Sequence, residues 1–189
     1  MDSRSSLLIL GLGNLLCRDD GLGAFVAQEI AGTRIIPEGV RVLDGGTLGL
    51  ALLPYLEDAE RAVLIDAIQT DEAAGTLVRL EGDEVGPAVA ARLSVHQVGV
   101  SDLIEAARWR DRIPPTLVLL GLVPETTDLG VGLSPAVLAG LPALVERVCE
   151  EAARLGFRLL KKAADESTTT PGDGGPSDRV GLRLLQPAG

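Results

Sequence analysis

Two aspartates and the chain's single histidine lie where short apolar segments end, which is where an active site of an α/β protein would form. Asp20 comes shortly after the apolar residues 7–10, Asp66 directly follows residues 62–65, and His96 lies in a loop beyond a fourth apolar segment. Two carboxylates and one imidazole form a mixed ligand set that suits nickel, zinc or iron and leaves coordination positions open. The sequence therefore predicts a metal site formed by Asp20, Asp66 and His96.

The elements that position these residues are strands and helices in alternation. Short, continuous apolar runs that end in glycine or aspartate are typical of buried parallel strands. Such runs occupy residues 7–10, 40–43, 62–65, 75–80 and 117–120, the fourth of them suited to a sheet edge. Apolar residues at helical spacing occur within 22–30, 48–56, 100–107 and 137–148. This alternation predicts an α/β fold, a doubly wound three-layer sandwich whose mostly parallel, twisted sheet of about five strands lies between helices.

Several of the predicted helices have recognisable ends. Thr47 is expected to cap the helix over 48–56, and Ser134 is expected to cap the last helix with Pro135 in its first turn. Gly156 suits the end of that helix, whereas Pro142 lies inside it and is expected to kink it or shift its start. In open α/β sheets, sites form beyond the carboxyl ends of the strands, so the fold would bring the three metal-site candidates together.

Each candidate ligand also has a structural alternative. Asp20 would serve as a helix N-cap. Asp66 would accept hydrogen bonds from backbone amides at the end of a strand, and a single histidine is more often structural than a ligand. The metal site is favoured because three separate elements place these residue types at one edge of the sheet.

The glycines near the start of the chain raise a second possibility. Gly11 and Gly13 after a strand, with Asp44 at the end of the next strand, resemble part of a dinucleotide-binding fingerprint. Leu16, however, stands where the fingerprint requires a third glycine. The acidic pair at 19–20 would also repel a pyrophosphate, so the sequence disfavours a nicotinamide-dependent oxidoreductase.

Nucleophilic catalysis is also disfavoured. Cys17 precedes the acidic pair, and neighbouring carboxylates oppose thiolate formation, so we expect a buried structural thiol rather than a nucleophile. Ser94 and Ser101 flank His96, but the chain has no Gly-x-Ser-x-Gly turn of the serine hydrolases.

Composition bounds the remaining classes. The 189 residues fit one domain, which we expect over residues 1–162, followed at 163–189 by a tail rich in Ser, Thr, Pro and Gly that should be disordered. The net charge of −10 disfavours binding to nucleic acid and to anionic membranes. No secretory signal is recognisable and the two cysteines do not form a disulfide framework, so a reducing cytoplasm is the expected compartment.

Taken together, these segments resemble the hydrogenase maturation proteases. The resemblance runs in order from about Leu7 to Leu155. It is carried by the following motifs: Gly11-Leu12-Gly13-Asn14-Leu15-Leu16, Asp19-Asp20-Gly21-Leu22-Gly23, Asp44-Gly45-Gly46-Thr47, Ile65-Asp66-Ala67, His96-Gln97-Val98-Gly99, Val123-Pro124-Glu125 and Leu133-Ser134-Pro135.

The resemblance implies an endopeptidase, of the aspartyl type, that removes a short C-terminal extension from the large subunit of nickel–iron hydrogenases after nickel insertion. The family's metal ligands map onto Asp20, Asp66 and His96, and the Asp44–Thr47 turn lies near its substrate cleft. The implied partner is the nickel-loaded precursor, and the nickel is expected to arrive with that substrate. The alternative is a non-catalytic chaperone that uses the same residues only to sense nickel in the precursor.

Overall fold

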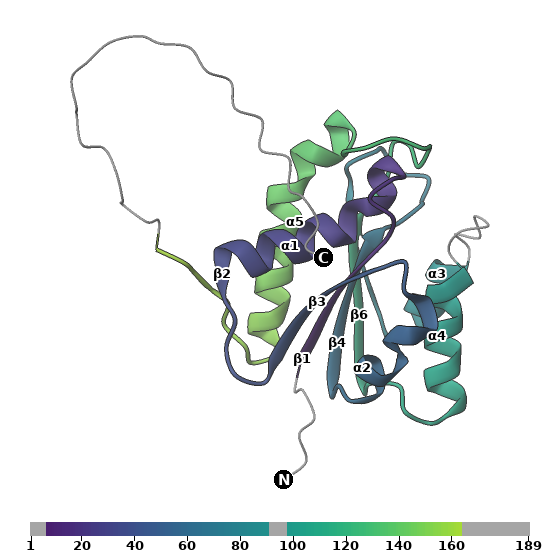
Figure 1. Cartoon of the computed structure of the whole chain (residues 1–189), viewed down its shortest axis with the longest axis vertical. Coiled ribbons are helices and arrows are strands. Elements are labelled where there is room, and N and C mark those ends of the chain that lie inside the picture. Colours follow the sequence, from purple (N-terminus) through teal and green to yellow (C-terminus); the bar gives the residue numbers. More distant parts are fainter. Residues whose placement is uncertain (1–6, 91–97, 164–189) are drawn as a thin grey trace, which may run out of the picture.

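A five-stranded sheet forms the centre of the computed structural model, which describes residues 7–90 and 98–163 (Figure 1). The strand order is β3-β1-β4-β6-β5, and all pairs are parallel except that of β5 with β6. The strands are β1 (Leu7–Leu12), β3 (Val40–Gly46), β4 (Arg61–Ala67), β5 (Leu77–Glu81) and β6 (Thr116–Leu122). The prediction of a mostly parallel sheet of about five strands, with the fourth at an edge, is confirmed.

Helices cover both faces of this sheet. Helices α1 (Leu22–Thr33) and α5 (Pro135–Arg154) pack on one face (Figure 1). The other face is covered by η2 (Gly49–Leu52), α2 (Leu53–Glu57) and α4 (Val98–Trp109), with η3 (Gly82–Glu84) and α3 (Val85–Ala90) beside them. The three-layer arrangement predicted from the alternation of strands and helices is therefore confirmed.

The core is split by the sheet into two apolar layers. Along β1, Leu7 and Ile9 face α1 and α5, whereas Leu8 and Leu10 face α2 and α4. Because successive side chains of a strand point to opposite faces, a strand covered on both faces has to be apolar at every position. This is the reason why the strands read as uninterrupted apolar runs, and why their positions could be predicted closely.

The predicted helix ends are confirmed in part. Ser134 caps α5, and its hydroxyl accepts a hydrogen bond from the Val137 amide (3.4 Å). Pro142 lies inside α5 without shifting its start, which is Pro135. The cap assigned to Thr47 is wrong: the chain turns through Gly46 (φ +45°) and Gly49 (φ +53°), and η2 begins only at Gly49.

A second, two-stranded sheet was not predicted. In it, β2 (Arg34–Ile35) pairs antiparallel with β7 (Leu160–Lys161). This pairing joins the end of α1 to the segment after α5. Strands of two residues have no periodicity that a sequence could show.

Within the described residues, no helix is both long enough and apolar enough to span a membrane. Almost all of the predicted tail, from residue 164 onward, lies outside the described residues.

Candidate functional site

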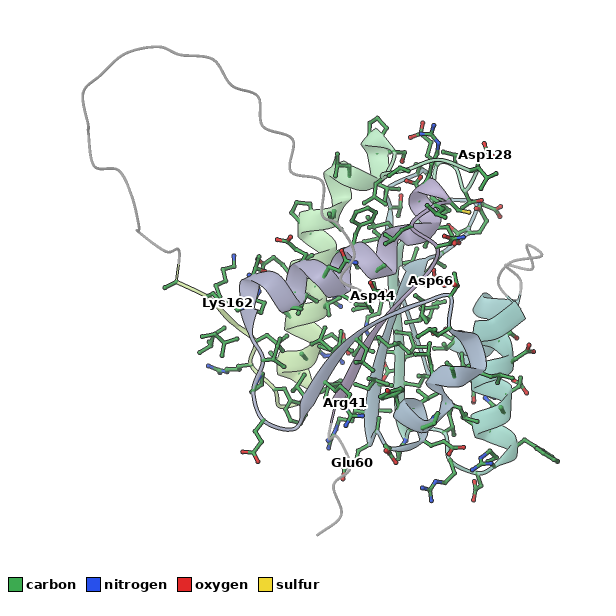
Figure 2. All side chains as sticks on the ribbon, in the orientation of Figure 1. Arg41, Asp44, Glu60, Asp66, Asp128 and Lys162 are labelled. Atoms are coloured by element: carbon green, nitrogen blue, oxygen red, sulfur yellow. The ribbon has the colours of Figure 1, made fainter. Side chains whose placement is uncertain are left out.

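The chain changes direction across the sheet beside β1, and two of the predicted ligands lie at that point. From β1 the chain passes through α1 to β3 on one side, and then crosses to β4 on the other side of β1. The carboxyl ends of β1 and β4 are thus the topological switch point, where ligands bind in open α/β sheets. Asp20 follows β1 in the short helix η1 (Arg18–Gly21), and Asp66 lies in β4 near its end. Figure 2 shows Asp66 at this end of the sheet, with Arg41 and Glu60 at the opposite end.

Two glycines allow the segment with Asp20 to approach the sheet closely. A Cβ atom on Gly23, in the first turn of α1, would lie 2.2 Å from the carbonyl oxygen of Ile65 in β4. A Cβ atom on Gly13, whose φ is +119°, would lie 1.6 Å from the carbonyl oxygen of Asp20. Only glycine permits these contacts, so the backbone of η1 and α1 rests directly on the ends of β1 and β4. The same contacts bring Asp20 toward the strand that carries Asp66.

Both carboxylates are buried and are oriented by backbone amides. Asp20 is 6% exposed and Asp66 is 3% exposed. The Asn14 amide donates to Asp20 Oδ2 (2.9 Å), and the Ala67 amide donates to Asp66 Oδ1 (2.8 Å). Asp20 caps neither η1 nor α1, which argues against its role as a helix cap. Asp66 does accept a hydrogen bond from a backbone amide at the end of its strand, which is the structural role described above as the alternative to metal binding. This hydrogen bond uses one carboxylate oxygen, Oδ1.

Two buried carboxylates from separate elements are a chemically suitable pair for a divalent cation of hard or borderline character. The third predicted ligand, His96, lies outside the described residues, so its position relative to Asp20 and Asp66 stays a prediction. No group of three potential metal-ligating side chains occurs within residues 7–90 and 98–163. The described part of the chain thus holds two of the three candidate ligands, Asp20 and Asp66.

Asp19, the neighbour of Asp20, has a structural role that the sequence did not reveal. It is fully buried, and its carboxylate accepts backbone hydrogen bonds from Glu125 (2.9 Å), Thr126 (3.1 Å) and Ser134 (2.6 Å). Burial alone would raise the pKa of Asp19, but the amides of Ser134, Thr126 and Glu125 together hold that pKa below its ordinary value. Asp19 thereby fixes both ends of the segment 125–134, which connects β6 to α5.

The middle of this segment is attached to the residues that precede Asp19. Gly130 donates its amide to the carbonyl of Leu16 (2.9 Å) and accepts from the amide of Arg18 (3.0 Å). Cys17 and Gly130 thus form a short parallel bridge. Figure 2 shows Asp128 of this segment at the same end of the molecule as Asp66. We call residues 125–134 the clamped loop.

Cys17 differs from expectation, because it is half-buried rather than fully buried. Asp44 is exposed, and its carboxylate accepts hydrogen bonds from the Gln28 side chain (2.8 Å) and the Gly46 amide (3.1 Å). Asp44 therefore stabilises its own turn and ties it to α1. Both cysteines are free thiols.

Comparisons with known proteins agree on one family. The family model described as hydrogenase maturation protease matches residues 25–151. The hydrogenase expression/formation protein HupD of Rhodobacter capsulatus is 37% identical over 159 residues, which cover 83% of this chain and 76% of that protein. The hydrogenase 2 maturation protease of Escherichia coli K12 is 31% identical, with 84% of this chain and 97% of that protein covered. The solved structure of the hydrogenase maturating endopeptidase HybD from E. coli superimposes with a TM-score of 0.78 at 31% identity, covering 82% of this chain and 97% of that one.

Proposed function

The chain belongs to the hydrogenase maturation proteases, and we propose that it removes the C-terminal extension of a nickel–iron hydrogenase large subunit after nickel insertion, with nickel held by Asp20, Asp66 and His96. The observation that carries this assignment is the burial of two carboxylates, from η1 and β4, at the switch point of the sheet. Two carboxylates from separate elements at one edge of the sheet offer hard oxygen ligands, and such ligands favour a divalent cation.

In the proposed reaction the nickel ion is part of the substrate, because the precursor carries it into the site. Bound there, it would act as a Lewis acid that polarises the scissile carbonyl or a water molecule. The protein's own contribution is to hold two carboxylates in fixed orientation. The amides of Asn14 and Ala67 orient one oxygen of each, so little reorganisation is needed when the precursor binds. A neutral nitrogen of His96 would complete the set. The two free thiols are in keeping with a reducing cytoplasm as the place of this reaction.

The test uses purified protein and purified precursor, with cleavage followed as a shift on a gel. The variants Asp20→Asn, Asp66→Asn and His96→Ala should remain folded and lose most processing of the nickel-loaded precursor. The matched control is Asp58→Asn, which makes the same change at an exposed residue next to the end of α2 and should process normally.

Two outcomes would contradict the proposal. Equal cleavage of nickel-free and nickel-loaded precursor would exclude the substrate-bound metal, and full activity of His96→Ala would exclude the ligand set. If the wild-type protein binds the nickel-loaded precursor without shortening it in the absence of other proteins, the chaperone alternative is correct instead.

A further inference from the structure

Three large apolar side chains are exposed around the bridge between Cys17 and Gly130. Leu16 is 63% exposed, Leu129 is 84% exposed and Val131 is 83% exposed. Each of them directly flanks a residue of the bridge in sequence. Single exposed apolar residues are common on protein surfaces, but several gathered at one place mark sites of interaction. We call Leu16, Leu129 and Val131 the apolar loop surface.

The backbone beneath this surface is fixed. Both ends of the clamped loop bind the buried carboxylate of Asp19, and its middle is hydrogen-bonded to Leu16 and Arg18. A Cβ atom on Gly130 would lie 2.8 Å from Nε of Arg18, so that side chain packs against the loop. A surface whose conformation is already fixed loses little entropy when a partner binds to it.

The position and the charge of this surface indicate what binds there. It adjoins η1, the element that carries Asp20, so a protein whose chain end enters the site must pass close to it. Glu125 and Asp128 are exposed on the same loop and outnumber the exposed Arg18 beside it, and the chain as a whole has a net charge of −10. A complementary partner would present an apolar patch with lysine or arginine at its rim.

We propose that the apolar loop surface docks the body of the large-subunit precursor, next to the point where its C-terminal extension emerges; this rests on the proposed function. The docked face of the precursor is apolar with a basic rim. Docking there holds the precursor while its chain end reaches Asp20 and Asp66, so the surface contributes to recognition of the precursor rather than to bond cleavage.

The experiment compares the wild-type protein with the double variant Leu129→Ser/Val131→Ser on purified, nickel-loaded precursor. Rates at increasing precursor concentration give KM and kcat, and titration of the precursor by light scattering or calorimetry gives Kd. Loss of two interface anchors should raise KM and Kd about tenfold and change kcat by less than about twofold. Glu125→Lys should also raise KM, and this effect should diminish with added salt.

The matched control is Trp109→Ser. Trp109 is 92% exposed at the end of α4, so this variant removes a large exposed apolar side chain elsewhere on the molecule. It should leave KM and Kd unchanged. An unchanged KM and Kd in the double variant, or an equal rise in Trp109→Ser, would overturn the proposal.

Two further outcomes separate this proposal from others. If the wild-type protein sediments as a dimer that the double variant dissociates while Kd for the precursor stays the same, the surface binds a second copy of this chain and the proposal is wrong. If the wild-type protein does not cleave the precursor at all, the proposed function fails, and the docking surface is still decided by comparing Kd between wild-type protein and the double variant.

Discussion

Replacing Asp19 by asparagine should strongly destabilise the protein, although the side chain keeps its shape. Asp19 Oδ1 accepts from Ser134, and Oδ2 accepts from both Glu125 and Thr126. An asparagine has only one acceptor oxygen, so its amide group must face at least one N–H donor. The least damaging orientation preserves the two bonds at Oδ2 and leaves the buried Ser134 amide without an acceptor.

The magnitude follows from these bonds. A hydrogen bond to a charged group contributes about 1.5–3 kcal/mol, and an unsatisfied buried donor costs about 1–3 kcal/mol. Losing one such bond and weakening the remaining two should lower the free energy of unfolding by about 3–5 kcal/mol. Urea denaturation measures this value, with Asp128→Asn as control, because that carboxylate is exposed on the same loop and should change stability by less than about 0.5 kcal/mol.

The pH dependence provides a second readout of the same change. Since the pKa of Asp19 is lower in the folded protein than its ordinary value of 3.8, its contribution is present above that value and is lost as the pH falls through the folded pKa. The difference between wild-type protein and Asp19→Asn should therefore be constant near neutral pH and shrink in acid. If the free energies of unfolding of wild-type protein and Asp19→Asn differ by less than about 1 kcal/mol at neutral pH, Asp19 does not hold the clamped loop in the way described.

Three other changes test separate parts of the structure. Gly23→Ala should destabilise the protein by about 1–3 kcal/mol or more and reduce processing, because its Cβ would lie 2.2 Å from the Ile65 carbonyl oxygen and push the first turn of α1 away from β4. Thermal melting measures the loss of stability, and the gel assay measures the loss of processing. Glu151→Gln should cost about 2–4 kcal/mol in urea, because Glu151 is 1% exposed and binds the guanidinium of Arg79 through both oxygens (3.0 Å each). That guanidinium holds the pKa of Glu151 below its ordinary value of 4.5, so this stabilisation should be present above that pH and lost as the pH falls further. A chain that ends at Lys162 should keep its melting temperature and its activity, because the Lys162 ammonium retains its bonds to the Ala31 (2.9 Å) and Gly32 (3.0 Å) carbonyls at the end of α1.

The sequence predicted the sheet well, because each central strand is buried on both faces and must be apolar throughout. It also placed Asp20 and Asp66 at one edge, since parallel strands share the direction of their carboxyl ends. Local hydrogen-bond chemistry was less predictable. Thr47 has the residue type of a helix cap, but the two glycines around it turn the chain before η2 begins.

The role of Asp19 could not be predicted because its partners are distant in sequence. The three amides that it accepts from belong to residues 106 to 115 positions later. The signal in the sequence was the turn-rich stretch between Val123 and Ser134, which lies between a predicted strand and a predicted helix. A buried aspartate beside such a stretch predicts nothing until the fold brings the two together.

The central position of β1 has a consequence for synthesis of the protein. β1 is made before the other strands of the sheet, yet it pairs on one side with β3 and on the other with β4, which begins at Arg61. At about 5–20 residues per second, the roughly 50 residues between β1 and β4 take a ribosome about 2.5–10 s. Throughout that time the leucine-rich strand has no completed sheet around it, and α5, which completes the apolar layer on one face of the sheet, is translated later still. The nascent chain is therefore expected to be prone to aggregation during this interval, and slowing translation before Arg61 should lower the yield of folded protein.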